Sequence, residues 1–141
     1  MKNGAIKFTD RQRNTRTYFA HSMDFHSPSE HTIEGSHLDL ELQFHMYAPE
    51  DPSRIAHTFA VFFDRGPNKE KGSKANPFLK QLAPFFEENN AIEFQPTRAD
   101  KLAVGSFVNK VLAQAVDESG EGREFWTYEG SLSKPPCYGD V

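Results

Sequence analysis

The alternation of apolar and polar residues in the first third of the chain is typical of β-strands. The clearest case is residues 38–47, where an apolar face and a polar face alternate because successive side chains of a strand point to opposite sides. The apolar face holds Leu38, Leu40, Leu42 and Phe44, and the polar face holds Glu41, Gln43 and His45. Further strands are predicted at residues 5–8, 17–26, 57–63 and 125–130.

Turn residues separate these strands. Ser27, Pro28 and Ser29 end the strand at residues 17–26, because proline supplies no donor to a strand ladder. Residues 11–14 and the pair Glu34 and Gly35 predict turns, and residues 49–53 predict a loop. The strands at residues 17–26 and 38–47 are therefore expected to be antiparallel neighbours in a twisted sheet.

The pattern changes to a helical one after a charged loop at residues 66–75. Asn76 is a candidate N-cap for a helix over residues 77–88, in which Pro84 predicts a kink or an early stop. A second helix is predicted over residues 106–118. The apolar stripes, expected to pack against the sheet, are Phe78, Leu82, Phe85 and Phe86 in the first helix and Phe107, Val111, Leu112 and Ala115 in the second.

These elements predict a mainly β fold with peripheral helices, of the α+β class, in one domain spanning residues 1–141. A chain of 141 residues with 37% hydrophobic and 26% charged residues has the composition of a globular domain. Its mean hydropathy of −0.67 is polar, so the 13 phenylalanines have to supply much of the core.

Charge and hydropathy exclude several classes of partner. A net charge of −4 and a pI near 5.8 give no basic surface for nucleic acid or an anionic membrane. No apolar run approaches the roughly 18 residues of a membrane span, and residues 1–10 contain no apolar signal region. The sequence therefore predicts a soluble protein, compatible with an organellar or cytoplasmic assembly.

The polar face of residues 38–47 has two interpretations. Antiparallel sheets commonly present one face to solvent, which would explain Glu41, Gln43 and His45 without any function. Alternatively these residues line a polar pocket together with Asp24 and His26, which lie two apart on the preceding strand and so share one face. Spacing alone leaves both interpretations open.

Two motifs resemble the α-carbonic anhydrase family. Residues 23–35 read MDFHSPSEHTIEG and residues 40–45 read LELQFH. In that family a His-x-His pair is followed by a Ser-Glu-His-Thr turn and by Glu-Leu-His on the next strand. Residues 125–137 read FWTYEGSLSKPPC and resemble the family's Trp-Thr-Tyr-x-Gly-Ser-Leu-Thr-x-Pro-Pro-Cys. The resemblance implies part of the family's twisted, largely antiparallel sheet.

The resemblance also implies that the zinc site is lost. The enzymes hold zinc through three neutral imidazoles, with a water molecule in the fourth position. The matching positions here are Asp24, His26 and Gln43, so one imidazole remains where three are needed, and neither metal nor other cofactor is expected. Glu41 matches the carboxylate that orients the third histidine, and its lost partner predicts a rearranged hydrogen-bond network.

Other catalytic positions are partly retained. Ser133 and Glu30 match the hydroxyl and carboxylate that act on the zinc-bound hydroxide in the family. Both are read as vestigial, with Glu30 accepting hydrogen bonds from backbone donors near Pro28. Lys134 would place a cation at the mouth of the cavity.

By the same resemblance, the chain is expected to lack the family's N-terminal portion and last strands. Cys137 matches half of a disulfide whose partner would lie in that N-terminal portion, and as the single cysteine it is expected to be a reduced thiol. Residues 99–122 are expected to be longer than their counterpart and to hold the extra helix. Sheet edges left open in this way predict other protein subunits as partners.

Three functional hypotheses follow. The leading one is a non-catalytic, carbonic anhydrase-like protein with a structural or binding role in a larger assembly. The alternative is zinc-dependent CO₂ hydration through a rearranged site in which His45 joins His26 and Asp24. The third is a small-molecule pocket that reuses the cavity, or a separate role with no pocket at all.

Overall fold

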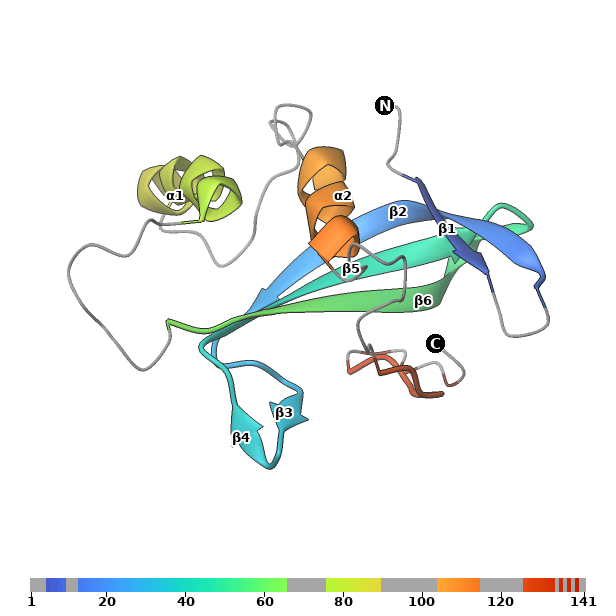
Figure 1. Ribbon diagram of the computed structural model, residues 1–141, viewed down its shortest axis with the longest axis horizontal. Helices are drawn as coiled ribbons and strands as arrows, with labels where there is room; N and C mark the ends of the chain where they lie inside the picture. Colours follow the sequence, from blue (N-terminus) through green and yellow to red (C-terminus); the bar gives the residue numbers. More distant parts are fainter. Residues whose placement is uncertain are drawn as a thin grey trace. The chain divides into compact units, whose positions relative to one another are not determined.

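The described part of the chain forms a small antiparallel sheet, a short hairpin and two helices (Figure 1). The computed structural model describes residues 5–9, 13–65, 76–89, 104–114, 126–133, 135, 137 and 139. These residues fall into two compact units: Lys2–Lys69 with Thr127–Val141 hold the sheet, and Glu70–Trp126 hold the helices.

The sheet has four strands in the order β1-β2-β5-β6, and all three pairings are antiparallel. Their bounds are Ala5–Thr9 for β1, Thr15–His26 for β2, Leu40–Ala48 for β5 and Asp51–Phe63 for β6. The predicted neighbours β2 and β5 do pair, with Asp24 opposite Gln43 and His26 opposite Glu41. The mainly β, antiparallel fold with few helices is confirmed.

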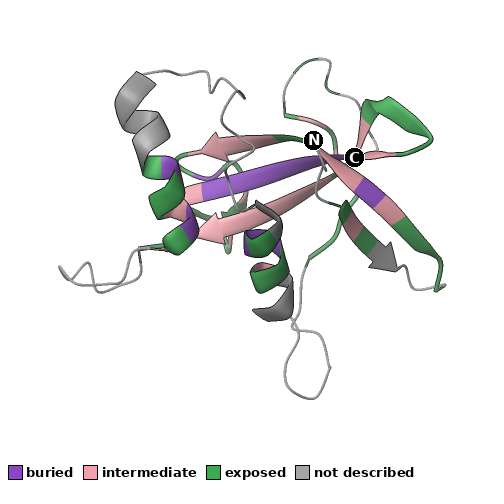
Figure 2. Ribbon diagram, turned by 90° about the horizontal axis from the view of Figure 1, so that it is seen from above, coloured by how far each residue is buried: buried purple, intermediate pink, exposed green. Residues whose placement is uncertain are grey.

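The central strand β5 is buried on both faces along most of its length (Figure 2). Leu42, Phe44 and Met46 provide the apolar face, and none of them is more than 3% exposed. Glu41, Gln43 and His45 are buried as well, at 0%, 4% and 6% exposure. The interpretation of the polar face as a solvent-exposed face is therefore wrong.

The turns after β2 follow the sequence, with one exception, and residues 11 and 12 of the turn predicted at residues 11–14 lie outside the described residues. β2 ends at His26, before a cis Ser27-Pro28 bond. Glu34 and Gly35 form the turn of a hairpin between β3 (Thr32–Ile33) and β4 (Ser36–His37), and both turn residues have positive φ. The loop expected at residues 49–53 is wrong, because β6 begins at Asp51. Proline is tolerated on an edge strand, and β6 is an edge of the described sheet, which accommodates Pro52.

The helices are α1 at Pro77–Asn89 and α2 at Val104–Gln114. Asn76 caps α1, since its Oδ1 accepts the backbone N–H of Phe78 at 2.9 Å. The early stop at Pro84 is wrong, because proline removes only one donor and α1 continues to Asn89. The second helix begins at Val104 rather than at residue 106, and residues 115–118 lie outside the described residues.

The apolar stripes of the two helices meet each other. The rings of Phe78 and Phe107 stack with centroids 4.1 Å apart, and Leu82 and Val108 are also buried. The stripe positions Phe85, Phe86, Leu112 and Ala115 lie outside the described side chains, and packing of the stripes on the sheet stays a prediction. None of the helices in the described ranges is long and apolar enough to cross a membrane.

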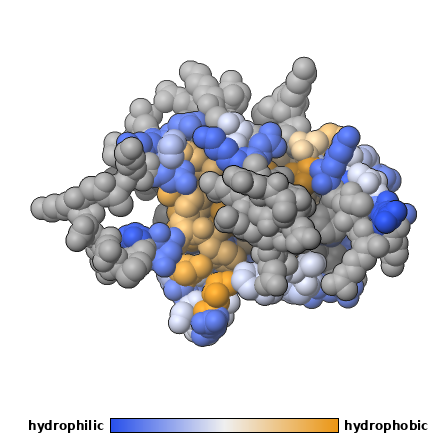
Figure 3. Space-filling model, in the orientation of Figure 1, coloured by the Kyte–Doolittle hydropathy of each residue, from blue (hydrophilic) through white to orange (hydrophobic). Residues whose placement is uncertain are grey.

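The strand expected at residues 125–130 does not form within its described part, residues 126–130. The ring of Tyr128 folds back over Gly130, where an added Cβ would lie 2.7 Å from the ring, and pairing is limited to one bridge between Ser131 and Gly139. Phe125 lies outside the described residues. Hydrophilic residues cover much of the coloured surface, with apolar residues exposed between them (Figure 3).

Candidate functional site

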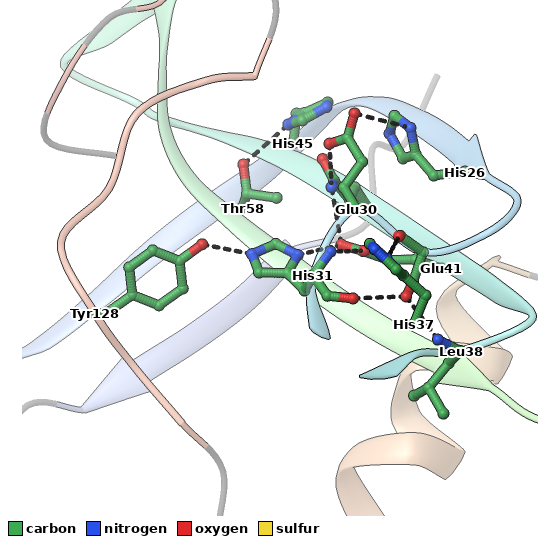
Figure 4. Close-up of polar contacts among 11 residues, drawn as sticks. His26, Glu30, His31, His37, Leu38, Glu41, His45, Thr58 and Tyr128 are labelled. Carbon is green, nitrogen blue, oxygen red and sulfur yellow. Dashed lines mark hydrogen bonds and ion pairs between the residues drawn. The ribbon is translucent and has the colours of Figure 1, made fainter. Parts of the chain in front are cut away.

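Three carboxylates and three histidines lie together on the polar face of β2 and β5 and in the turn between β2 and β3. Figure 4 shows Glu30 and Glu41 with His26, His31 and His45. Each carboxylate faces one imidazole. Glu30 Oε1 lies 3.2 Å from His26 Nδ1, Glu41 Oε1 lies 2.6 Å from His31 Nδ1, and Asp24 Oδ2 lies 2.9 Å from His45 Nε2. The predicted residues Asp24, His26, Gln43 and His45 therefore share one side of the sheet.

Glu41 is the centre of this network. Its side chain is fully buried and accepts hydrogen bonds from the backbone N–H of His31 at 2.9 Å, from the His31 ring and from Gln43 Nε2 at 2.8 Å. Burial alone would raise the pKa of Glu41, but these hydrogen bonds outweigh burial and leave the pKa below its ordinary value. Glu41 therefore has hydrogen-bond partners in this structure, and a rearrangement relative to the family stays a prediction.

His31 and Tyr128 complete the network, although the sequence motifs did not single them out. The His31 ring joins Glu41 on one side and the Tyr128 hydroxyl on the other. Tyr128 lies 97 residues further along the chain, so only the folded structure brings this hydroxyl to the ring. The Ser-Glu-His-Thr and Trp-Thr-Tyr motifs were the available signal, because each contains one of the two residues.

Glu30 bonds side chains rather than the expected backbone donors. Its carboxylate faces His26 and accepts a hydrogen bond from Gln43 Nε2 at 3.1 Å. Ser133, the other retained position, is exposed, and within the described ranges no hydrogen bond joins it to Glu30. Lys134 lies outside the described residues, and Cys137 is a free, exposed cysteine.

His45 is held from both sides. Its Nε2 faces Asp24 Oδ2, and its Nδ1 lies 2.9 Å from the hydroxyl oxygen of Thr58 on β6. Thr58 stands directly opposite His45 in the β5–β6 register. Sequence reasoning missed Thr58, because nothing in the motifs marks the position that faces His45 across the sheet.

Metal-ligating groups are not gathered at one point in the described part of the chain. No three His, Cys, Asp or Glu side chains there are placed so that they could hold a metal ion together. Gln43 directs its Nε2 at both Glu41 and Glu30. The Nε2 atom of His26 is buried and has no hydrogen-bond partner among the described residues.

The whole chain matches one family. The family model for eukaryotic-type carbonic anhydrase covers residues 2–141. The chain belongs to the α-carbonic anhydrase family. This confirms the resemblance carried by the two motifs. The assignment of the family's zinc-ligand positions to Asp24, His26 and Gln43 stays a prediction.

The curated relatives of this carbonic anhydrase-family chain are of two kinds. It is 28% identical to dioscorin DB3S of Dioscorea polystachya over 88% of this chain and 38% of the relative. It is 32% identical to alpha carbonic anhydrase 8 of Arabidopsis thaliana over 92% of this chain and 28% of the relative. Alpha carbonic anhydrase 4 of the same plant is 31% identical over 96% of this chain and 41% of the relative.

The chain thus spans between 28% and 41% of the length of these three proteins. No solved structure matches the chain at the significance that these relatives reach.

Proposed function

We propose that this carbonic anhydrase-family chain has a structural or binding role in a protein assembly and does not hydrate CO₂ through a bound zinc ion. The observation that carries the proposal is the use of two former ligand positions as internal hydrogen-bond partners. Asp24 is bonded to His45, and Gln43 donates its amide to Glu41 and Glu30.

The donor set does not fit tetrahedral zinc. Gln43 presents its N–H donors, not a lone pair, toward the carboxylates that hold it. Asp24 is already bonded to the Nε2 of His45, so a metal ion would compete with that contact for the carboxylate. Only His26 keeps a buried nitrogen that lacks a partner among the described residues, and one imidazole does not make a closed zinc site.

The second candidate function is zinc-dependent CO₂ hydration by a rearranged site made of His26, His45 and Asp24. The buried Nε2 of His26 favours it, because such an atom costs free energy when it has no partner. The two hydrogen bonds of His45 oppose it, because both ring nitrogens are already engaged, one with Asp24 and one with Thr58.

Metal analysis of the purified protein separates the two functions. After incubation with zinc and removal of the excess, we expect less than stoichiometric zinc and no acceleration of CO₂ hydration. Zinc at one equivalent that is lost on His26→Ala would overturn the proposal. The double variant Asp24→His with Gln43→His restores three imidazoles at the ligand positions and is expected to bind zinc, with Glu50→Gln as a matched surface control.

The assembly role is proposed from uncovered apolar surface. Trp126 and Tyr128 are 78% and 66% exposed, and exposed aromatic side chains are enriched where proteins bind one another. Residues 99–122 are the proposed contact region, and α2 lies within them. Expressing the 141 residues alone tests this role: a soluble monomer with a cooperative melt would contradict it, and solubility only on co-expression with a partner would support it.

A further inference from the structure

His45 links a carboxylate and a hydroxyl in one hydrogen-bonded chain. Asp24 on β2, His45 on β5 and Thr58 on β6 lie on three adjacent strands, with 2.9 Å at each of the two contacts. Figure 4 shows the contact between His45 and Thr58. The sheet register fixes this order, since Thr58 stands opposite His45 and Asp24 is two pairs further along β2, on the same face. Groups held by sheet strands are positioned more firmly than groups on loops.

The carboxylate determines where the imidazole carries its proton. An ionised carboxylate only accepts hydrogen bonds, so Nε2 of His45 has to donate to Asp24. In the neutral ring Nδ1 is then an acceptor, and the Thr58 hydroxyl has to donate to it. A hydroxyl that donates to an imidazole, which is oriented in turn by a carboxylate, is the arrangement that activates an oxygen nucleophile.

Asp24, His45 and Thr58 differ in solvent exposure in a way that suits this chemistry. The His45 side chain is 8% exposed, which protects the base from water, whereas Asp24 is 26% exposed and Thr58 is partly exposed. A buried imidazole needs partners for both nitrogens, and that need alone would explain one hydroxyl and one carboxylate. Reactivity of Thr58 is what distinguishes a nucleophile from a partner that merely satisfies the ring.

We propose that Thr58 is an acyl-acceptor site, modified by activated carboxylic esters with His45 as the general base and Asp24 as its positioning residue. The Thr58 oxygen forms a bond to the acyl carbon, and the bond from that carbon to the departing alcohol oxygen breaks. The hydroxyl proton passes to Nδ1 of His45 and then to the departing oxygen. The products are a Thr58 ester and a free alcohol, with no oxidation or reduction and no metal. This site is independent of the proposed assembly role.

The test uses p-nitrophenyl acetate and the purified protein. We expect at most one equivalent of p-nitrophenolate to be released in a burst, and one acetyl group to appear on the peptide of residues 55–65. Trypsin releases this peptide by cleaving after Arg54 and Arg65, and Thr58 is its single hydroxyl residue. An unmodified peptide from folded protein would overturn the proposal.

Variants test whether the reaction depends on the hydrogen bonds that join Asp24, His45 and Thr58. Thr58→Val is expected to abolish the adduct, and Thr58→Ser to retain it. Asp24→Asn keeps the shape of the side chain but removes the charge that orients His45, so acylation should slow by on the order of 10²-fold or more. The control is Ser53→Ala, because the Ser53 hydroxyl bonds the carboxylate of Asp51 without an imidazole. An adduct that persists in folded Thr58→Val, or an unchanged rate in Asp24→Asn, would refute the assignment.

Discussion

Replacing Glu41 by glutamine removes the charge at the centre of the buried network while keeping the length of the side chain. Three donors converge on the carboxylate: the His31 backbone, the His31 ring and Gln43. A glutamine side chain offers one acceptor oxygen and an NH₂ group, so at least one of these donors would face another donor.

The expected loss of stability is large. A hydrogen bond to a charged group contributes about 1.5–3 kcal/mol, and the three bonds to Glu41 share one acceptor and do not add fully. Removing an acceptor so that a buried donor is left unsatisfied typically costs about 1–3 kcal/mol. We expect Glu41→Gln to cost about that amount, which is a large part of the roughly 5–15 kcal/mol that stabilises a typical domain.

Urea unfolding followed by tryptophan fluorescence and circular dichroism measures this cost. Glu50→Gln is the matched control, because Glu50 is exposed in the turn between β5 and β6 and should stay within about 0.5 kcal/mol of the wild type. A loss of less than about 1 kcal/mol in Glu41→Gln would refute the central place of Glu41 in the network.

The pH profile gives a second readout. The pKa of folded Glu41 lies below its ordinary value of 4.5, so the folded state holds the proton less tightly than the unfolded state. The stabilisation from Glu41 is therefore complete above pH 4.5 and is lost as the pH falls through the lower, folded pKa. This acid-dependent loss should be smaller in Glu41→Gln.

Three more predictions test the fold. Leu42→Ala, at a fully buried position of β5, should cost about 2–5 kcal/mol in urea unfolding. Asn76→Ala removes the cap of α1 and should cost about 1 kcal/mol, with less helical circular dichroism. Burial, and then the nearby Arg16 charge, lower the pKa of His57 below 6.5, so stability should fall as the pH drops below 6.5; His57→Gln should flatten that part of the measured profile.

Local chemistry explains what the sequence predicts well. Strict alternation over residues 38–47 anticipated which side chains of β5 share a face, and Asn76 before Pro77 anticipated the start of α1. Both rules depend on neighbours in the chain, so they can be read without tertiary contacts. The predicted start of this strand is two residues too early, because Leu38 and Asp39 continue the alternation but lie outside β5.

Contacts between distant segments explain what the sequence could not supply. A period of two does not distinguish a solvent-exposed face from a buried polar network. Glu41 is bonded by His31 across the hairpin, and the His31 ring in turn joins Tyr128 near the end of the chain. The pairing of Thr58 with His45 depends on the β5–β6 register, which shifts twice between the turn at Pro49-Glu50 and this pair. Alignment between strands is a property of the folded sheet, not of either segment.

The two buried faces of β5 also specify its register in the sheet, because one face is apolar and the other is polar. Sliding β5 by a single position would turn Leu42 and Phe44 toward the carboxylates and imidazoles, and would push Glu41 and Gln43 into the hydrocarbon side. Each such exchange would leave buried polar groups without hydrogen-bond partners. A misaligned sheet would therefore lose stability on both of its faces. Retaining these polar groups therefore gives the sheet a means of rejecting wrong pairings during folding, whatever ligand chemistry its ancestors performed.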